Sequence, residues 1–205
     1  MEQNMAYRSL HSGYLPGSPG IFFEKQNFHR KEIIMTTYKL VATAAAGIEA
    51  LVGKELRTLG YDCQVENGKA YFTGGDYDIA KTNIYLRTAD RIKIVFGQFT
   101  AKTFDALFEQ TKALPWEQIL PVDAEFPVSG KSVKSTLHSV PNCQSIVKKA
   151  IVNRLSAAYA RRTHLPETGA LYPIEVSILK DVVTLTIDTS GTSLFKRGYR
   201  TDKGG

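Results

Sequence analysis

The sequence contains few cysteines and no long apolar run. Among its 205 residues are two cysteines, Cys63 and Cys143, which lie far apart in the chain. This number excludes a disulfide-dense secreted scaffold and a cysteine-rich zinc site, and it is typical of a reducing compartment. The apolar runs are far shorter than the stretch of about 18 residues that a membrane span needs. We therefore expect a soluble, cytoplasmic protein without a membrane partner.

Motifs for catalysis, metal binding and nucleotide cofactors are also missing. The four histidines do not have the spacing of a metal site, and none is near a cysteine pair. The sequence has neither the Gly-x-Ser-x-Gly turn of hydrolases nor the Gly-x-Gly-x-x-Gly fingerprint of dinucleotide sites. It therefore predicts no catalytic residue, no metal site and no cofactor site in this chain.

The first 34 residues differ from the rest of the chain. Overall, 43% of the residues are apolar and 22% are charged, which predicts a folded core. Glycine and proline crowd residues 13–20, however, and no helical or strand period survives there. The three methionines stand at positions 1, 5 and 35, and regular patterning begins after Met35. We interpret 1–34 as a disordered leader or an over-called upstream start, with a small extra subdomain as the alternative.

Residues 35–100 have the element order of a ferredoxin-like unit. Asn67-Gly68 predicts a hairpin, because this pair accepts the positive φ angles of a type I′ turn. Asp76 is the expected N-cap of the second helix. The predicted elements are a strand at 38–44, a helix at 48–59, a hairpin at 63–66 and 70–73, a helix at 76–86 and a strand at 91–99. The order β-α-β-β-α-β is that of a ferredoxin-like domain.

Residues 101–200 form a second α/β module by the same reasoning. Its predicted elements are a helix at 103–113 capped by Thr103, a short strand at 125–131, a long helix at 139–162 and an antiparallel hairpin at 173–180 and 182–188. The long helix needs a sheet to cover its apolar arc. Because no linker separates the modules, we expect an α+β fold in which a ferredoxin-like N-terminal domain packs against an α/β domain.

Positive charge is concentrated in the second half of the chain. The net charge is +6, but residues 35–125 hold 10 Lys/Arg and 12 Asp/Glu, whereas 126–205 hold 12 Lys/Arg and 5 Asp/Glu. The 41 residues between Glu125 and Glu167 contain seven cations and no acid. Solvated helix faces normally interleave both signs, so this stretch predicts a phosphate-binding surface, with an ordinary basic helix as the alternative.

Two short motifs support the same hypothesis. Gly130-Lys-Ser-Val-Lys-Ser offers backbone N–H groups, hydroxyls and ammonium groups to phosphate, although it is not a P-loop. Lys196-Arg-Gly-Tyr-Arg combines three cations with an aromatic ring that can stack on unpaired bases. The predicted RNA-binding residues are Lys131, Ser132, Lys134, Ser135, Lys148, Lys149, Arg154, Arg161, Arg162, Lys196, Arg197, Tyr199 and Arg200. Arg154 lies within the apolar arc of its helix, so a structural role between the modules is its alternative.

Four segments together resemble one protein family. They are Met35–Leu56, Gly130–Ser135, Ser145–Val152 and Ser193–Arg200. They are similar to the N-terminal part of bacterial THUMP-domain RNA methyltransferases, the group related to the 23S rRNA guanine-N2 methyltransferases. The resemblance implies a ferredoxin-like domain at 35–100 and a THUMP domain for structured RNA at 101–200. It also implies a linker at 201–205 to a Rossmann-like methyltransferase domain that uses S-adenosylmethionine.

The resemblance leads to a function with two alternatives. The Asn-Pro-Pro-Tyr type motif that holds the target amino group in such enzymes is absent, so this chain alone should bind RNA and catalyse nothing. Its expected partners are structured RNA, in particular 23S rRNA, and the methyltransferase domain in cis, but not DNA. One alternative is the THUMP module of a tRNA-modifying enzyme such as a thiouridine synthase. The other is an interaction module whose basic helix docks an acidic protein.

Overall fold

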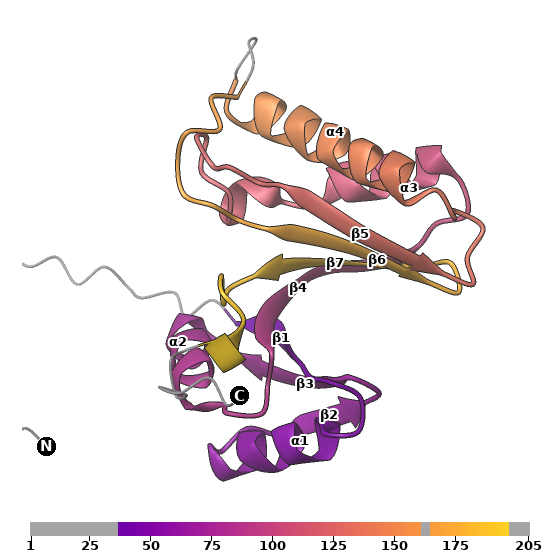
Figure 1. Ribbon diagram of the computed structural model, residues 1–205. Coiled ribbons are helices and arrows are strands. Elements are labelled where there is room, and N and C mark those ends of the chain that lie inside the picture. Colours follow the sequence, from indigo (N-terminus) through magenta and orange to yellow (C-terminus); the bar gives the residue numbers. More distant parts are fainter. Residues whose placement is uncertain (1–36, 161–164, 197–205) are drawn as a thin grey trace, which may run out of the picture. The chain divides into compact units, whose positions relative to one another are not determined.

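The computed structural model describes residues 37–160 and 165–196, whose strands form a single seven-stranded sheet (Figure 1). Its elements are β1 (Tyr38–Thr43), α1 (Glu49–Thr58), β2 (Cys63–Glu66), β3 (Lys69–Gly74), α2 (Asp76–Tyr85), β4 (Arg91–Thr100), α3 (Phe104–Ala113), η1 (Trp116–Gln118), β5 (Val128–Val133), α4 (Val140–Ala158), β6 (Ile174–Leu179), β7 (Val182–Asp188) and η2 (Leu194–Lys196). Several predictions lie outside the described residues: the leader at 1–34, the linker at 201–205, and Arg161, Arg162, Arg197, Tyr199 and Arg200.

The first half of the sheet is ferredoxin-like, as predicted. Strand β1 pairs antiparallel with both β3 and β4, and β2 pairs with β3, which gives the order β2-β3-β1-β4. Asp76 is not the N-cap of α2, however. Gly75 occupies that position, and its backbone N–H donates to the Asp78 carboxylate at 2.8 Å. The side chain that caps the start of α2 is therefore that of Asp78, the third residue of the helix, and not that of Asp76.

The two hairpin turns differ from the sequence prediction. A type I′ turn needs a positive φ at both central residues. In the β2–β3 hairpin only Gly68 has one, at 71°, so the predicted type I′ turn is wrong there. Both central residues of the β6–β7 hairpin have positive φ, with Lys180 at 51° and Asp181 at 64°. The type I′ geometry therefore occurs at a Lys-Asp pair that lacks the usual glycine.

The second half of the sheet carries the THUMP-region elements. Strands β5 and β6 are parallel and are joined through α4, and β6 and β7 form the predicted antiparallel hairpin. Thr103 caps α3, with its hydroxyl oxygen accepting from the Ala106 N–H at 3.2 Å, as expected. Helix α4 ends at Ala158, four residues earlier than predicted, and Ala160 has a left-handed φ of 50°. A residue in that conformation cannot continue a right-handed helix.

Strand β4 joins the two halves into one sheet. Its first residues pair with β1, and Lys93 through Thr100 pair with β7, in the strand order β2-β3-β1-β4-β7-β6-β5. The register shifts between Val95 and Gly97, which marks a bulge at Phe96. The α+β prediction of a ferredoxin-like domain packed against an α/β domain is therefore confirmed, and the two domains also share backbone hydrogen bonds.

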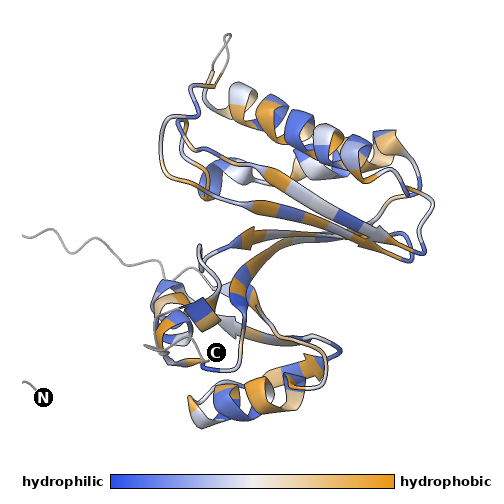
Figure 2. Cartoon of the chain, viewed as in Figure 1, coloured by the Kyte–Doolittle hydropathy of each residue, from blue (hydrophilic) through white to orange (hydrophobic). Residues whose placement is uncertain are grey.

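Alternation along the strands sorts the side chains onto two faces. One face is apolar and continuous from β3 to β6, since Phe72, Leu40, Ile94, Ile187 and Ile174 are successive cross-strand neighbours and all are buried. Each of the four helices contributes to this same core, through residues such as Val52, Ile79, Leu107 and Val147. Figure 2 shows the resulting alternation of hydrophobic and hydrophilic bands along the strands. The opposite face, which we call the helix-free face, has no described helix over it.

Candidate nucleic-acid interface

Most of the described candidate residues lie in β5, in the turn after it and in α4. Lys131 and Ser132 lie in β5, and Lys134 and Ser135 follow it in the turn that leads to α4. Lys131 projects from the side of β5 opposite α4, because its neighbour Gly130 faces α4. We call the remaining six residues the β5–α4 surface; they are Ser132, Lys134, Ser135, Lys148, Lys149 and Arg154. Lys196 is separate, because it lies in η2 and lines a pocket with Asn83 of α2. The sequence could not show this separation, since chain order carries no information about which strand neighbours which.

Gly130 does not stand in a loop. It lies within β5 opposite Val176 of β6, and a Cβ added to it would come within 3.0 Å of the Val176 side chain. The serine hydroxyls also have protein partners. Ser132 donates to the Leu137 carbonyl at 2.6 Å, and Ser135 donates to the Val133 carbonyl at 2.9 Å and accepts from the Asp181 N–H at 3.1 Å. The Gly-Lys-Ser motif is therefore part of a strand and its turn, and it does not form a phosphate cradle like a P-loop.

The described candidate cations of β5, its following turn and α4 differ in their availability. The Lys148 ammonium donates to Glu167 at 2.7 Å and to the Phe126 carbonyl at 3.1 Å, and it stands 3.7 Å from the centre of the Phe126 ring. Lys131 pairs with Glu175 at 2.8 Å. Lys134 and Lys149 are exposed. These two lysines are therefore the better placed for phosphate.

Arg154 forms a structural contact within the second module, and not between the two modules as the sequence suggested. Its Nε and one terminal nitrogen donate to the two carboxylate oxygens of Glu117 at 2.9 and 2.5 Å. This hydrogen bonding lowers the pKa of Glu117 and raises the pKa of Arg154. The bidentate pair ties α4 to η1, and Tyr159 adds a second tie by donating to the Leu120 carbonyl at 2.7 Å.

Replacing Arg154 with methionine should therefore affect stability rather than RNA binding. We expect Tm to fall by about 2–4 °C, because the tie between α4 and η1 is lost while the aliphatic stem is kept. Thermal unfolding followed by circular dichroism measures this, with Lys149→Met on the same helix as the control. An unchanged Tm, or a loss of RNA affinity as large as that of the control, would contradict the assignment.

Residues 126–166 contain no acidic residue, but carboxylates from other parts of the chain pair with their cations. Glu117, Glu167 and Glu175 all lie outside residues 126–166, and they pair with Arg154, Lys148 and Lys131. The fold brings these carboxylates from η1, from the chain before β6 and from β6 itself. Part of the positive charge that the sequence predicts as a free surface is therefore neutralised within the protein.

Sequence reasoning also missed a group of lysines on the strands. Lys39, Lys69 and Lys93 lie on the helix-free face of β1, β3 and β4, together with Lys131 of β5. They stand in the half of the chain whose net charge is slightly negative. The alternation of side chains along each strand could have revealed them. Each lysine is next in sequence to a buried residue of the apolar face, such as Leu40, Ala70 or Ile94, and so projects to the opposite face.

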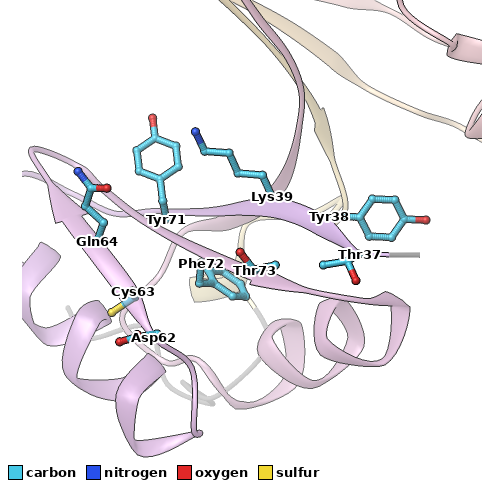
Figure 3. A pocket seen from close by; sticks show the side chains of 9 residues that line it. All are labelled: Thr37, Tyr38, Lys39, Asp62, Cys63, Gln64, Tyr71, Phe72 and Thr73. Atoms are coloured by element: carbon cyan, nitrogen blue, oxygen red, sulfur yellow. The ribbon is translucent and has the colours of Figure 1, made fainter. Parts of the chain in front are cut away.

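Figure 3 shows one end of the helix-free face, beside a pocket of about 590 Å³. Lys39, Tyr71 and Gln64 project to the same side of the sheet, whereas Phe72 and Cys63 project to the other side. The Lys39 ammonium lies 5.1 Å from the centre of the Tyr71 ring. Burial is the main cause that raises the pKa of Tyr71, and the Glu66 carboxylate adds to it. Lys39 of β1 therefore lies beside a half-buried aromatic ring, and Lys69 precedes that tyrosine by two residues on β3, on the same face of the sheet.

Other kinds of site find little support in the described part of the chain. No group of three or more His, Cys, Asp or Glu side chains at 37–160 and 165–196 is arranged to hold a metal ion. Within the same residues, no helix has the length and apolar character needed to span a membrane. Cys143 is buried, and its burial raises the pKa of the thiol, which disfavours a reactive thiolate.

Comparison with family models matches both halves of the fold. Residues 39–93 match the RlmL ferredoxin-like domain, and residues 101–188 match the THUMP domain. The chain therefore consists, over these residues, of an RlmL ferredoxin-like domain followed by a THUMP domain. THUMP domains bind RNA. Both matches lie inside the ranges 35–100 and 101–200 that the sequence predicts for the two domains.

The chain is also similar to longer proteins that are named as methyltransferases. It is 56% identical over 172 residues to the putative RNA methyltransferase YpsC of Bacillus subtilis (strain 168). The matched segment covers 83% of this chain and 45% of that protein. It is 28% identical over 165 residues to the ribosomal RNA large subunit methyltransferase K/L of Syntrophotalea carbinolica, covering 80% of this chain and 23% of the relative. The chain thus spans less than half of either relative.

Two solved structures have the same fold over the matched part. The predicted N6-adenine-specific DNA methylase from Listeria monocytogenes is 66% identical, with a TM-score of 0.80 over 83% of this chain and 45% of that one. SMU.472, a putative methyltransferase complexed with SAH, is 58% identical, with a TM-score of 0.78. The match covers 81% of this chain and 45% of that one. The prediction of a THUMP-domain methyltransferase relative is therefore confirmed.

Proposed function

We propose that this chain is the RNA-binding part of an S-adenosylmethionine-dependent methyltransferase that acts on 23S rRNA in the cytoplasm. The observation that carries this proposal is the pairing, in one sheet, of a THUMP domain with a ferredoxin-like domain of the RlmL type. The relative named as a large-subunit rRNA methyltransferase supports rRNA as the substrate. Transfer to a guanine N2 is what the resemblance of the sequence implies for the whole enzyme.

S-adenosylmethionine supplies the methyl group in such an enzyme, but the described residues do not fit it. A nucleotide-type cofactor binds at a glycine-rich turn between a parallel strand and a helix. The parallel step in this fold runs from β5 to α4, and residues 134–139 between them contain no glycine. We therefore assign no part of methyl transfer to these residues, whose role is to hold RNA for a catalytic domain.

Binding assays with the 205-residue chain test the proposal. We expect it to bind a structured 23S rRNA fragment, more tightly at about 50 mM than at about 200 mM salt, because phosphate contacts dominate such binding. Transfer RNA and duplex DNA of matched length are the competitors. A preference for tRNA would favour a tRNA-modifying enzyme instead. Absence of RNA binding at the lower salt would overturn the proposal.

Reversing one exposed charge should weaken this binding. Lys149→Glu is the clean variant, because Lys148 is paired with Glu167 and its reversal would also disturb the protein. We expect a loss on the order of 1 kcal/mol in RNA affinity and a salt slope reduced by about 1. The matched control is Lys54→Glu, which changes another exposed helical lysine, on α1. Equal losses in both variants would mean that net charge matters and that the β5–α4 surface does not.

A further inference from the structure

The helix-free face of the sheet carries more cations than acids. Its charged residues are found by alternation, since they are one position away from the buried residues of the apolar face. The five cations are Lys39, Lys69, Arg91, Lys93 and Lys131, and the three acids are Glu66, Glu175 and Asp188. Arg91 and Asp188 form an ion pair. The remaining four lysines face two carboxylates.

These lysines come from strands that are distant from one another in the sheet. Strands β1, β4, β7 and β6 lie between β3, which carries Lys69, and β5, which carries Lys131. In a flat sheet, five strand spacings would place these two strands about 24 Å apart. The sheet is not flat, however (Figure 1), and the pKa of Lys69 is lowered first by burial and then by the charge of Lys131.

The sheet curls around its helix-free face. Figure 1 shows this curl about β4, with α3 and α4 outside one half of the sheet and α1 and α2 outside the other. The bulge at Phe96 is at the point where β4 passes from one half to the other, and bulges increase strand bending. The lysines on the inner side of the curl thus face one another across a confined space, where their fields add.

Glu175 organises the charge at the centre of this face. Its carboxylate accepts from Lys93 at 2.6 Å and from Lys131 at 2.8 Å. Lys93 is only 11% exposed and stays committed to this pair, whereas the Lys131 side chain is 54% exposed. Lys39 interacts with the Tyr71 ring, and Lys69 stands opposite Glu66 at the end of the hairpin. Lys39, Lys69 and Lys131 are therefore the groups that an incoming anion can reach.

We propose that the helix-free face binds one single-stranded segment of RNA, whose phosphates contact Lys39, Lys69 and Lys131 and one of whose bases stacks on Tyr71. Positive grooves combined with aromatic platforms are the usual means of binding single strands. We expect a single strand rather than a duplex, because the sheet curls around this face (Figure 1) and a flexible single strand can follow that curve. This inference rests on the proposed function, and it adds a second contact surface that includes the ferredoxin-like domain.

The test compares matched lysine variants of the 205-residue chain. Lys39→Met together with Lys69→Met removes two charges from the helix-free face while keeping the aliphatic stems. Lys54→Met together with Lys102→Met removes two exposed lysines from outside this face, one on α1 and one in the bend between β4 and α3. The probes are a short single-stranded oligouridylate and a blunt RNA duplex, with affinity measured by fluorescence anisotropy at two salt concentrations. Thermal unfolding establishes that each variant is folded.

The first pair should bind the single strand about tenfold or more weakly, with a salt slope reduced by about 2, because two phosphate contacts are lost. The second pair should change this affinity by less than about threefold. Tyr71→Leu should cost about fivefold or more for the single strand, because base stacking is lost. Duplex affinity should be unchanged by Lys39→Met with Lys69→Met.

Each other outcome contradicts a specific claim. Wild-type binding that neither Lys39→Met with Lys69→Met nor Tyr71→Leu reduces would overturn this inference and leave the proposed function intact. Equal losses for single strand and duplex would show that the face attracts any phosphate and does not select a single strand. Failure of the wild-type chain to bind either probe or the rRNA fragment would overturn the proposed function itself.

Discussion

Replacing Trp116 with alanine is expected to lower the free energy of unfolding by about 3–5 kcal/mol. Trp116 is the single tryptophan of the sequence, and its side chain is completely buried in η1. Its ring centre lies 4.5 Å from that of Phe96, the bulge residue of β4, and its Nε1–H donates to the Thr111 carbonyl at 2.8 Å. The substitution therefore leaves a large cavity and removes one of the two hydrogen bonds to the Thr111 carbonyl, which also accepts from the Leu114 N–H at 3.3 Å.

Urea unfolding followed by far-ultraviolet circular dichroism measures this loss, since the variant lacks the tryptophan that fluorescence would report. Trp116→Phe should fall between wild type and alanine, because it keeps the aromatic contact but loses the hydrogen bond. Tyr77→Ala is the control, as Tyr77 is 76% exposed and should cost less than about 0.5 kcal/mol. A loss for Trp116→Ala no larger than that of Tyr77→Ala would show that η1 does not hold the THUMP domain against β4.

The second large effect is an acid-dependent loss of stability through Glu175. Burial alone would raise the pKa of its carboxyl, but hydrogen bonds and charge from Lys131 and Lys93 lower it from 4.5 to about 2. The pKa is thus lower in the folded than in the unfolded protein. The stabilisation is fully present above pH 4.5 and is lost as pH falls toward 2. Between pH 7 and pH 3 we expect a loss on the order of 2 kcal/mol.

Glu175→Gln separates this contribution from those of the other acids. The variant should be less stable than wild type at pH 7, because Lys93 is left nearly buried without its anion. The difference between the two proteins should shrink as pH falls from 5 to 2, as urea unfolding at each pH would show. Glu109→Gln, at an exposed position on α3, is the control. A difference that stays constant over this range would contradict the low pKa of Glu175.

Much of the fold could be predicted from local sequence patterns. Apolar alternation located the strands, and turn residues separated them, so the element order of both domains was correct. Details that depend on backbone geometry were not predictable in this way. The type I′ turn formed at Lys180-Asp181, where the twist of β6 and β7 demands it, while Asn67-Gly68 adopted another geometry. The pairing of β4 with β7 was also missed, because nothing local to either strand indicates its partner.

The candidate site shows the same division more sharply. The sequence by itself determined which side chains can meet phosphate, and the excess of cations after residue 126 is a property of composition alone. Only the tertiary structure decided which of those cations remain available, because Coulombic pairing depends on distance in space. It brought Glu117, Glu167 and Glu175 to Arg154, Lys148 and Lys131. By curling one sheet through both domains (Figure 1), it also placed Lys39, Lys69 and Lys131 on one face.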